Sequence, residues 1–173
     1  MDIQSTYQII QFEREHKWRF ACKYLLGLWE NERDNADLLL QTIAEHWLTL
    51  VDYKDQYIDL KKTLVLLTRY GLKHFNREAK FLSLVGYMIT LFPYLFFENS
   101  AEEQDGRWQK TGESMLLKAY RLEPRNILFK VLYLGSKSYT KEYMDAKKQL
   151  KTQLYTFFPG ETAIEIYFRD VLS

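Results

Sequence analysis

The clearest indication of the fold lies in the stretch Ser114-Met-Leu-Leu-Lys-Ala-Tyr-Arg-Leu-Glu-Pro-Arg-Asn126. We interpret it as the end of a helix that Pro124 closes, because proline lacks an amide hydrogen and clashes with the preceding turn. Pro159 follows 35 residues later, after Tyr-Thr-Phe-Phe. Prolines that close helices at a period of about 34 residues are typical of arrays of helical hairpins. Such arrays build binding surfaces, so the stretch favours a binding protein.

The composition favours a single all-helical domain over residues 1–173. The chain is 47% hydrophobic and 16% aromatic, which excludes a disordered protein and supplies a substantial core. Only seven glycines and three prolines occur, and all three prolines lie beyond residue 90, so the first half has little turn punctuation. No convincing run of alternating strand residues occurs. We therefore expect an all-α protein of about eight helices in antiparallel hairpins.

The hydrophobic period and the polar breaks set the bounds of the expected helices. They cover about 6–29, 35–50, 55–70, 78–92, 108–122, 127–137, 140–157 and 162–172. Pro93 is expected to end the fourth helix, and Thr140 is expected to cap the seventh. The polar stretch 98–106 is expected to form the longest loop, or a helix start capped by Ser100.

The Ala119-x4-Pro124 spacing resembles the end of a tetratricopeptide unit. In that family a small residue lets two helices approach, and a proline closes the second helix. Gly86 takes the small position of the matching first helix if residues 98–106 are an insertion. The resemblance covers about residues 80–160 and implies tetratricopeptide-like packing in the C-terminal half.

The whole chain resembles certain bacterial immunity proteins. The resemblance rests on its length, its aromatic-rich helices and its ending, Phe158-Pro-Gly160-x-x-Ala-Ile-Glu-Ile-Tyr-Phe-Arg-Asp-Val-Leu-Ser173. These proteins accompany the toxins of contact-dependent growth inhibition and other polymorphic toxin systems. The resemblance implies a protein that binds the C-terminal domain of one cognate toxin and blocks its active site. Immunity proteins are diverse in fold, so the family supplies no residue rule for this chain.

An acidic stripe is the expected binding site. Asp52, Asp55 and Asp59 recur at i, i+3 and i+7, which places them on one helical face. Such carboxylates can mimic a phosphate backbone for a basic nuclease toxin, and nearby tyrosines can anchor the interface. The residues expected to bind the toxin are Asp52, Asp55, Asp59, Glu45, Tyr53 and Tyr57. The other interpretation is an ordinary solvated face.

The distribution of charge supports an acidic N-terminal surface. Residues 1–60 hold eleven Asp/Glu against six Lys/Arg, a net charge of −5. Residues 61–173 hold twelve against eighteen, a net charge of +6. This asymmetry favours long-range steering of a partner, although a chance scatter of solvated charges gives the same count. The residues that would extend the acidic patch are Glu30, Glu32, Asp34 and Asp37.

The sequence carries no specific catalytic signature, so we expect a protein that is not an enzyme and has no catalytic residue, cofactor or metal. Glu13-x-x-His16 places both side chains on one helical face, but a di-iron bundle needs two such pairs, so we expect an exposed face. Cys22 is expected to be a small buried residue. The enzyme alternative, a helical hydrolase or metalloenzyme, requires Glu13, His16 and His46 to converge in one pocket with a metal.

A cytoplasmic location is expected. Cys22 is the only cysteine, and residues 1–6 lack the basic start and apolar run of a signal peptide. The longest apolar stretch, about 81–97, is interrupted by Pro93 and three small or polar residues, so no membrane partner is expected. The basic residues form no recognised nucleic-acid motif.

The alternative function is a generic helical-repeat adaptor for protein–protein interaction. It would bind a peptide in a concave groove lined by residues such as Tyr87 and Tyr133. A toxin-binding protein and an adaptor differ in their partner, and the sequence leaves both interpretations open.

Overall fold

The computed structural model describes residues 2–52, 58–97 and 106–173, and all regular elements in these ranges are helices, which confirms the all-α class. The described residues form ten α-helices and one 3-10 helix, where the sequence predicted about eight helices. The elements are α1 (Ile3–Arg14), α2 (Trp18–Asn31), α3 (Ala36–Asp52), α4 (Ile58–His74), α5 (Ala79–Leu91), η1 (Pro93–Phe96), α7 (Arg107–Leu122), α8 (Ile127–Gly135), α9 (Lys141–Lys151), α10 (Leu154–Phe157) and α11 (Ala163–Leu172). None of these helices is long and apolar enough to cross a membrane.

Two expected helices are each divided in the structure. The predicted helix over 6–29 ends at Arg14, and His16 adopts a left-handed backbone with φ 55° before α2 begins. The predicted helix over 140–157 breaks at Thr152 and Gln153 into α9 and α10. Neither break contains a glycine or a proline, so the sequence carried no local signal for it.

Other helix ends follow the predicted chemistry. Thr140 caps α9, because its side chain accepts a hydrogen bond from the Tyr143 amide at 3.2 Å. Pro93 ends α5 and begins η1, as expected from its missing amide hydrogen. Helix α7 ends at Leu122, two residues before Pro124. The expected loop over 98–106 lies outside the described residues except for Gly106, the N-cap of α7.

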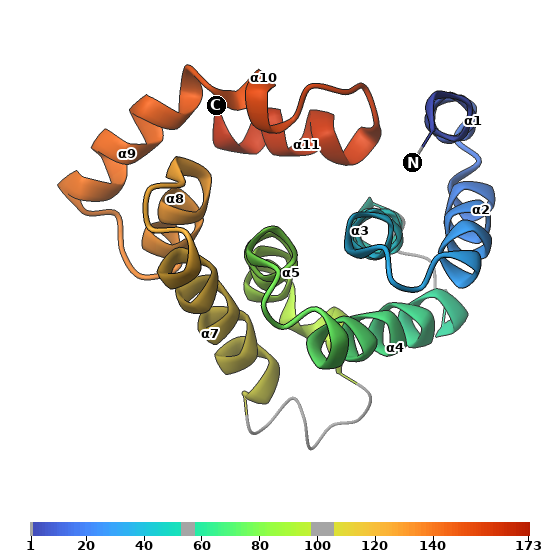
Figure 1. Ribbon diagram of the computed structural model, residues 1–173, viewed down its shortest axis with the longest axis horizontal. Helices are drawn as coiled ribbons and strands as arrows, with labels where there is room; N and C mark the ends of the chain where they lie inside the picture. The colour runs from blue at the N-terminus through green and yellow to red at the C-terminus, as the bar shows by residue number, and fades with distance from the viewer. Residues whose placement is uncertain (1, 53–57, 98–105) are drawn as a thin grey trace.

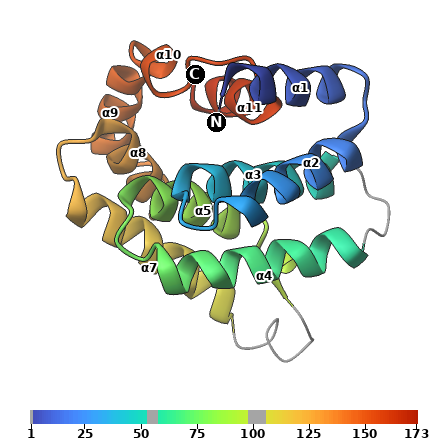
Figure 2. The same ribbon diagram turned by 45° about the vertical axis from the view of Figure 1, so that its right-hand side comes forward.

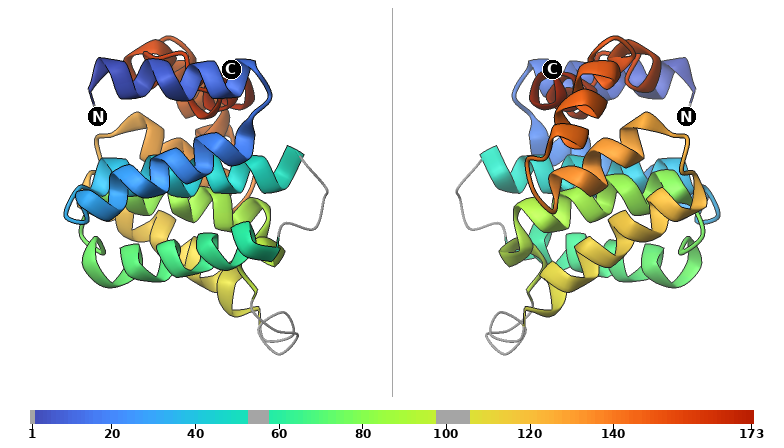
Figure 3. Two further views of the ribbon diagram at one scale, coloured as in Figure 1. Left: turned by 90° about the vertical axis from the view of Figure 1, so that its right-hand side faces the viewer. Right: turned by 90° about the vertical axis from the view of Figure 1, so that its left-hand side faces the viewer.

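The outer helices follow one another around a ring that encloses α3 and α5, and α11 returns to lie beside α1 (Figure 1). Figure 2 and both views of Figure 3 place α1 and α11 next to each other at one end of the molecule. Helix α3 packs against α2, α4, α5 and α11, so the outer helices surround it. Helices α5 and α7 form the most extensive helix–helix contact.

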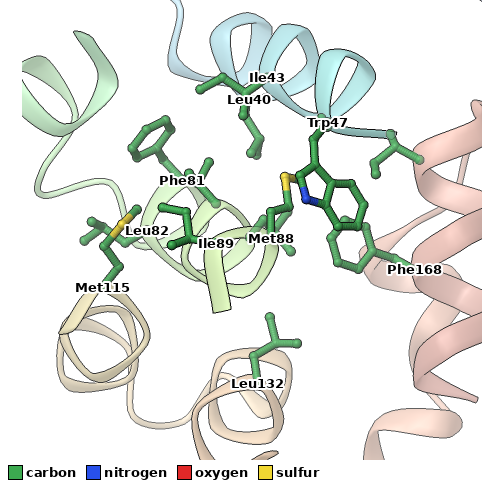
Figure 4. Close-up of a cluster of buried hydrophobic side chains, with 14 of the residues drawn as sticks. Leu40, Ile43, Trp47, Phe81, Leu82, Met88, Ile89, Met115, Leu132 and Phe168 are labelled. Carbon is green, nitrogen blue, oxygen red and sulfur yellow. The ribbon is translucent and has the colours of Figure 1, made fainter. Parts of the chain in front are cut away.

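The core extends through most of the helices, and one part of it lies between α3, α5 and α11. Figure 4 shows Trp47 of α3, Met88 of α5 and Phe168 of α11 close together, and all three side chains are buried. The Trp47 ring also lies 5.3 Å from the ring of Tyr167 and 5.7 Å from that of Phe92. Aromatic side chains therefore connect the C-terminal helix to the N-terminal half of the chain.

The crossing of α5 and α7 depends on two glycines. A Cβ added to Gly86 would lie 3.0 Å from the Gly112 carbonyl oxygen, and a Cβ on Gly112 would lie 3.0 Å from the Gly86 carbonyl. The helices therefore approach closely at these positions.

Candidate functional site

Asp59 is the one residue of the predicted acidic stripe whose side chain the structure describes. It lies in the first turn of α4, and its Oδ2 accepts a hydrogen bond from Arg19 Nη2 of α2 at 2.6 Å. Both side chains are exposed. The predicted binding residues Tyr53, Asp55 and Tyr57, and the side chain of Asp52, lie outside the described part of the chain.

Glu45 does not join Asp59 on the surface. Its side chain is only 2% exposed and is paired with Glu13 of α1. The structure therefore separates Glu45 from the acidic stripe near which the sequence placed it.

The acidic residues around the α2–α3 turn also lie apart from Asp59. Arg19, the partner of Asp59, stands at the start of α2, whereas Glu30 is at its end, about 16 Å further along the helix by its rise per residue. Asp37, in the first turn of α3, instead pairs with Lys80 at 2.8 Å. These acidic residues form a second exposed region rather than an extension of the first.

A hollow of about 410 Å³ lies beside Asp59, between α2 and α4. The residues that line it are Arg19, Phe20, Lys23, Leu26, His46, Asp59, Leu60 and Thr63. Phe20 is 62% exposed, and Ile58, next to Asp59 in the chain, is 64% exposed. Apolar side chains thus lie in the open between charged ones, and we call these lining residues together with Ile58 the α2–α4 surface.

His46 forms the floor of this hollow. It is buried, and its Nδ1 lies 2.8 Å from the Thr42 carbonyl oxygen. Burial lowers the pKa of His46 to about 4, so the ring is neutral at pH 7. Because a carbonyl only accepts, Nδ1 carries the proton and Nε2 is the acceptor.

A pair of buried carboxyl groups joins α1, α3 and α11. Glu13 Oε2 accepts a hydrogen bond from the Ala163 amide, the first residue of α11, at 3.0 Å. Glu13 also shares a hydrogen bond with Glu45 of α3. Burial raises the pKa of Glu13 to about 7 and raises the pKa of Glu45 well above its usual range, where the charge of Glu13 adds to the effect. The prediction that Glu13 lies on an exposed helical face is therefore wrong, because α11 covers it.

Cys22 lies near this pair and is fully buried, as the sequence predicted. Its Sγ lies 3.4 Å from Thr49 Oγ1. Burial, together with the charge of Glu45, raises the pKa of the thiol to about 12. The thiol therefore stays protonated at pH 7 and is a poor nucleophile.

A second hollow, of about 390 Å³, lies between α5, α8 and α9. Tyr87, Tyr139 and Tyr143 line it, and Tyr139 is largely exposed. Tyr133, which the adaptor interpretation placed in the same groove, instead stacks on Tyr120 with ring centroids 5.3 Å apart. Tyr87 also contacts Phe168, so α11 lies along one side of this hollow.

The enzyme alternative required Glu13, His16 and His46 in one pocket, and the structure does not bring them together. Glu13 is paired with Glu45, His16 is exposed in the turn after α1, and His46 faces the α2–α4 surface. Over the described ranges, no three His, Cys, Asp or Glu side chains are grouped so that they could hold a metal ion.

No family model, curated protein or solved structure matches this chain. The function must therefore be argued from the surfaces described above.

Proposed function

We propose that this protein binds another protein stoichiometrically, and that the partner is a cognate bacterial toxin domain whose active site it covers. The observation that carries the proposal is the exposed Phe20 beside the α2–α4 hollow. Protein interfaces combine an apolar centre with a polar rim, and aromatic residues dominate their binding energy. Phe20 and Ile58 supply the apolar centre, and Arg19, Lys23 and Asp59 supply the rim.

The choice of a toxin rests on the resemblance to immunity proteins and on charge. The net charge of −5 over residues 1–60 suits a basic partner such as a nuclease, whose active site binds phosphates. In this account the α2–α4 surface contacts the toxin, and the carboxylate of Asp59 on that surface steers the encounter. Tetratricopeptide-like packing of the C-terminal half is part of the proposal, and the close approach at Gly86 and the buried Ala119 support it.

Growth rescue tests the function in cells. Predicted toxin domains encoded beside this gene are expressed with and without the protein, and wild-type protein is expected to restore growth against one of them. Phe20→Asp is expected to abolish rescue, because a charge placed in a desolvated interface centre weakens binding by on the order of 30-fold or more. Met144→Ala is the control, since it also alters an exposed apolar side chain, at 56% exposure, but on α9. Absence of rescue by the wild type, or equal rescue by Phe20→Asp, would contradict the proposal.

Asp59 is expected to act on the rate of association. Reversing its charge with Asp59→Lys should slow association with a basic toxin by a few-fold at low salt, and the difference should shrink as salt rises. Asp37→Lys is a matched control, because Asp37 is also exposed, in the first turn of a helix and paired with a basic side chain. Stopped-flow mixing measures both rates. Equal slowing by the two variants would assign steering to the whole acidic region and not to the α2–α4 surface.

The adaptor alternative keeps one supporting observation, the tyrosine-lined hollow between α5, α8 and α9. A peptide-binding adaptor would use Tyr139 and Tyr143 and would be insensitive to Phe20→Asp. Tyr139→Ala therefore separates the two candidates in the same binding assay.

A further inference from the structure

We propose that Glu13 and Glu45 form a proton-dependent clasp that holds α11 against α1 and α3, and that loss of its proton releases α11 from the aromatic face of α3 and α5. This device is separate from the α2–α4 surface and does not depend on the proposed function.

The carboxyl pair lies buried where α1 and α3 meet α11. Glu13 of α1 is 6% exposed and Glu45 of α3 is 2% exposed, and both helices contact α11. The Ala163 amide that Glu13 accepts belongs to a helix 150 residues further along the chain. An amide at a helix N-terminus needs an acceptor, and no side chain of its own segment caps it. Glu13 therefore acts as a tertiary cap for α11.

The buried Glu13–Glu45 pair needs a proton to avoid repulsion between two carboxylates. Neither Glu13 Oε1 nor Glu45 Oε1 accepts a hydrogen bond from an amide or hydroxyl group of the described residues. Two adjacent buried carboxylates repel each other, so one must stay protonated and donate to the other. The side-chain hydrogen bond between Glu13 and Glu45 lets the two carboxyl groups share one proton.

The groups that face the pair do not compensate a negative charge. Glu165 of α11 is a further carboxylate whose charge raises the pKa of Glu13. Cys22 of α2 is a protonated thiol, and His46, next to Glu45 on α3, is neutral because of its lowered pKa. Arg19 of α2, which lies near Cys22, is paired with Asp59. Ionisation of both carboxyl groups would therefore be met by like charge and neutral groups.

Residues 158–172 form a segment that can move as one body. Arg169 donates to the Phe158 carbonyl at 2.6 Å and to the Gly160 carbonyl at 2.5 Å. Glu165 accepts from the Gly160 amide at 3.0 Å and from Thr162 Oγ1 at 2.8 Å. These bonds fasten α11 to its own preceding turn. Its contacts with the rest of the chain include the Glu13 cap, aromatic packing on Trp47 and Tyr87, and contacts with α9 and α10.

The direction of the pH response follows from linkage. In the released state both carboxyl groups titrate near 4.5, whereas in the clasped state the pKa of Glu13 is about 7 and that of Glu45 lies well above its usual range. The clasped state therefore holds more protons between these values. Its stabilisation is complete below pH 4.5 and is lost as the pH rises through 7 and beyond. Each proton that only the clasped state retains changes the equilibrium between the clasped and released states by up to about tenfold per pH unit between these pKa values.

Hydrogen exchange of backbone amides tests the clasp. Protection factors, corrected for intrinsic exchange rates, are measured for α11 and for α5 between about pH 5 and about pH 8. In the wild type, α11 is expected to lose protection by about tenfold or more and to fall below α5. Glu45→Gln keeps a donor for Glu13 but cannot ionise, and Glu13→Gln keeps an acceptor for Ala163. Each is expected to make the α11 response flatter, and either variant suffices if the other does not fold.

Glu113→Gln is the control, because Glu113 is an accessible carboxylate paired with Lys137 on the opposite half of the chain. It should leave the wild-type response intact. Three results would overturn the clasp. The first is a wild-type protection of α11 that does not change with pH, and the second is an unchanged pH response in the glutamine variants. The third is a loss of protection in α11 that only parallels that of α5 and reaches the same value. The last of these outcomes would mean that the pair acts only on global unfolding.

Discussion

Trp47→Ala is expected to lower the free energy of unfolding by about 3–5 kcal/mol. The side chain is fully buried on α3, and its ring packs against Phe92 at the end of α5 and Tyr167 of α11. Alanine would remove these contacts and leave a cavity where α3, α5 and α11 meet (Figure 4). The surrounding rings are held by other helices and cannot collapse fully into that space.

Chemical denaturation at constant pH measures this loss. Tyr7→Ala is a suitable control, because Tyr7 is a large aromatic residue that is exposed on α1, and its removal should change stability by less than about 0.5 kcal/mol. A loss below about 1 kcal/mol for Trp47→Ala would show that this residue does not join the two halves of the chain.

Gly71→Ala is expected to destabilise the protein by up to about 2 kcal/mol, although alanine is the better helix former. The new Cβ would lie 2.6 Å from Phe81 Cε2 and closer still to Cζ, with Leu39 Cδ2 at 3.1 Å. Phe81 is fully buried, so its ring must be displaced within a packed core, at a cost of about 1–3 kcal/mol. The gain in helix propensity of about 1 kcal/mol offsets only part of this cost.

Gly27→Ala provides the matched control on α2. Nothing lies within 4 Å of a Cβ at that position, so only the propensity gain remains and stability should rise by about 0.5–1 kcal/mol. The two substitutions are chemically identical, and thermal or denaturant unfolding should therefore shift in opposite directions. Stabilisation by both would mean that α4 and α5 pack less tightly than described.

The sequence was sufficient to predict the helical class and several helix ends. Pro93 and Thr140 act through local chemistry, a missing amide hydrogen and a capping hydroxyl, and both behave as expected. The break at His16 could not be predicted in this way, because few non-glycine residues of any type adopt a left-handed backbone and apolar residues recur on both sides of it. Packing of α1 beside α11 accompanies this break, and that contact joins residues 150 positions apart.

At the candidate sites too, the sequence predicted features that depend on neighbouring residues but not contacts between distant helices. Asp59 is exposed in the first turn of α4, but Asp52 ends α3, so the i, i+3, i+7 spacing does not place the two on one helix. Helical spacing also said nothing about Arg19 or Phe20, which α2 brings beside Asp59. Glu45 was misplaced because charged residues are normally exposed. One signal was present: α3 carries apolar residues on nearly all sides from Leu38 to Leu48, which is typical of a helix surrounded by others.

The most direct test of the proposed toxin binding through the α2–α4 surface is hydroxyl-radical labelling of the free protein and of its complex with a toxin domain identified by growth rescue. Phe20 and Met144 are both exposed in the free protein, so each should be oxidised before the toxin is added. The account predicts a complex of one protein to one toxin in which oxidation of Phe20 falls strongly while that of Met144 is unchanged. Equal oxidation of Phe20 in the free and bound states would contradict it.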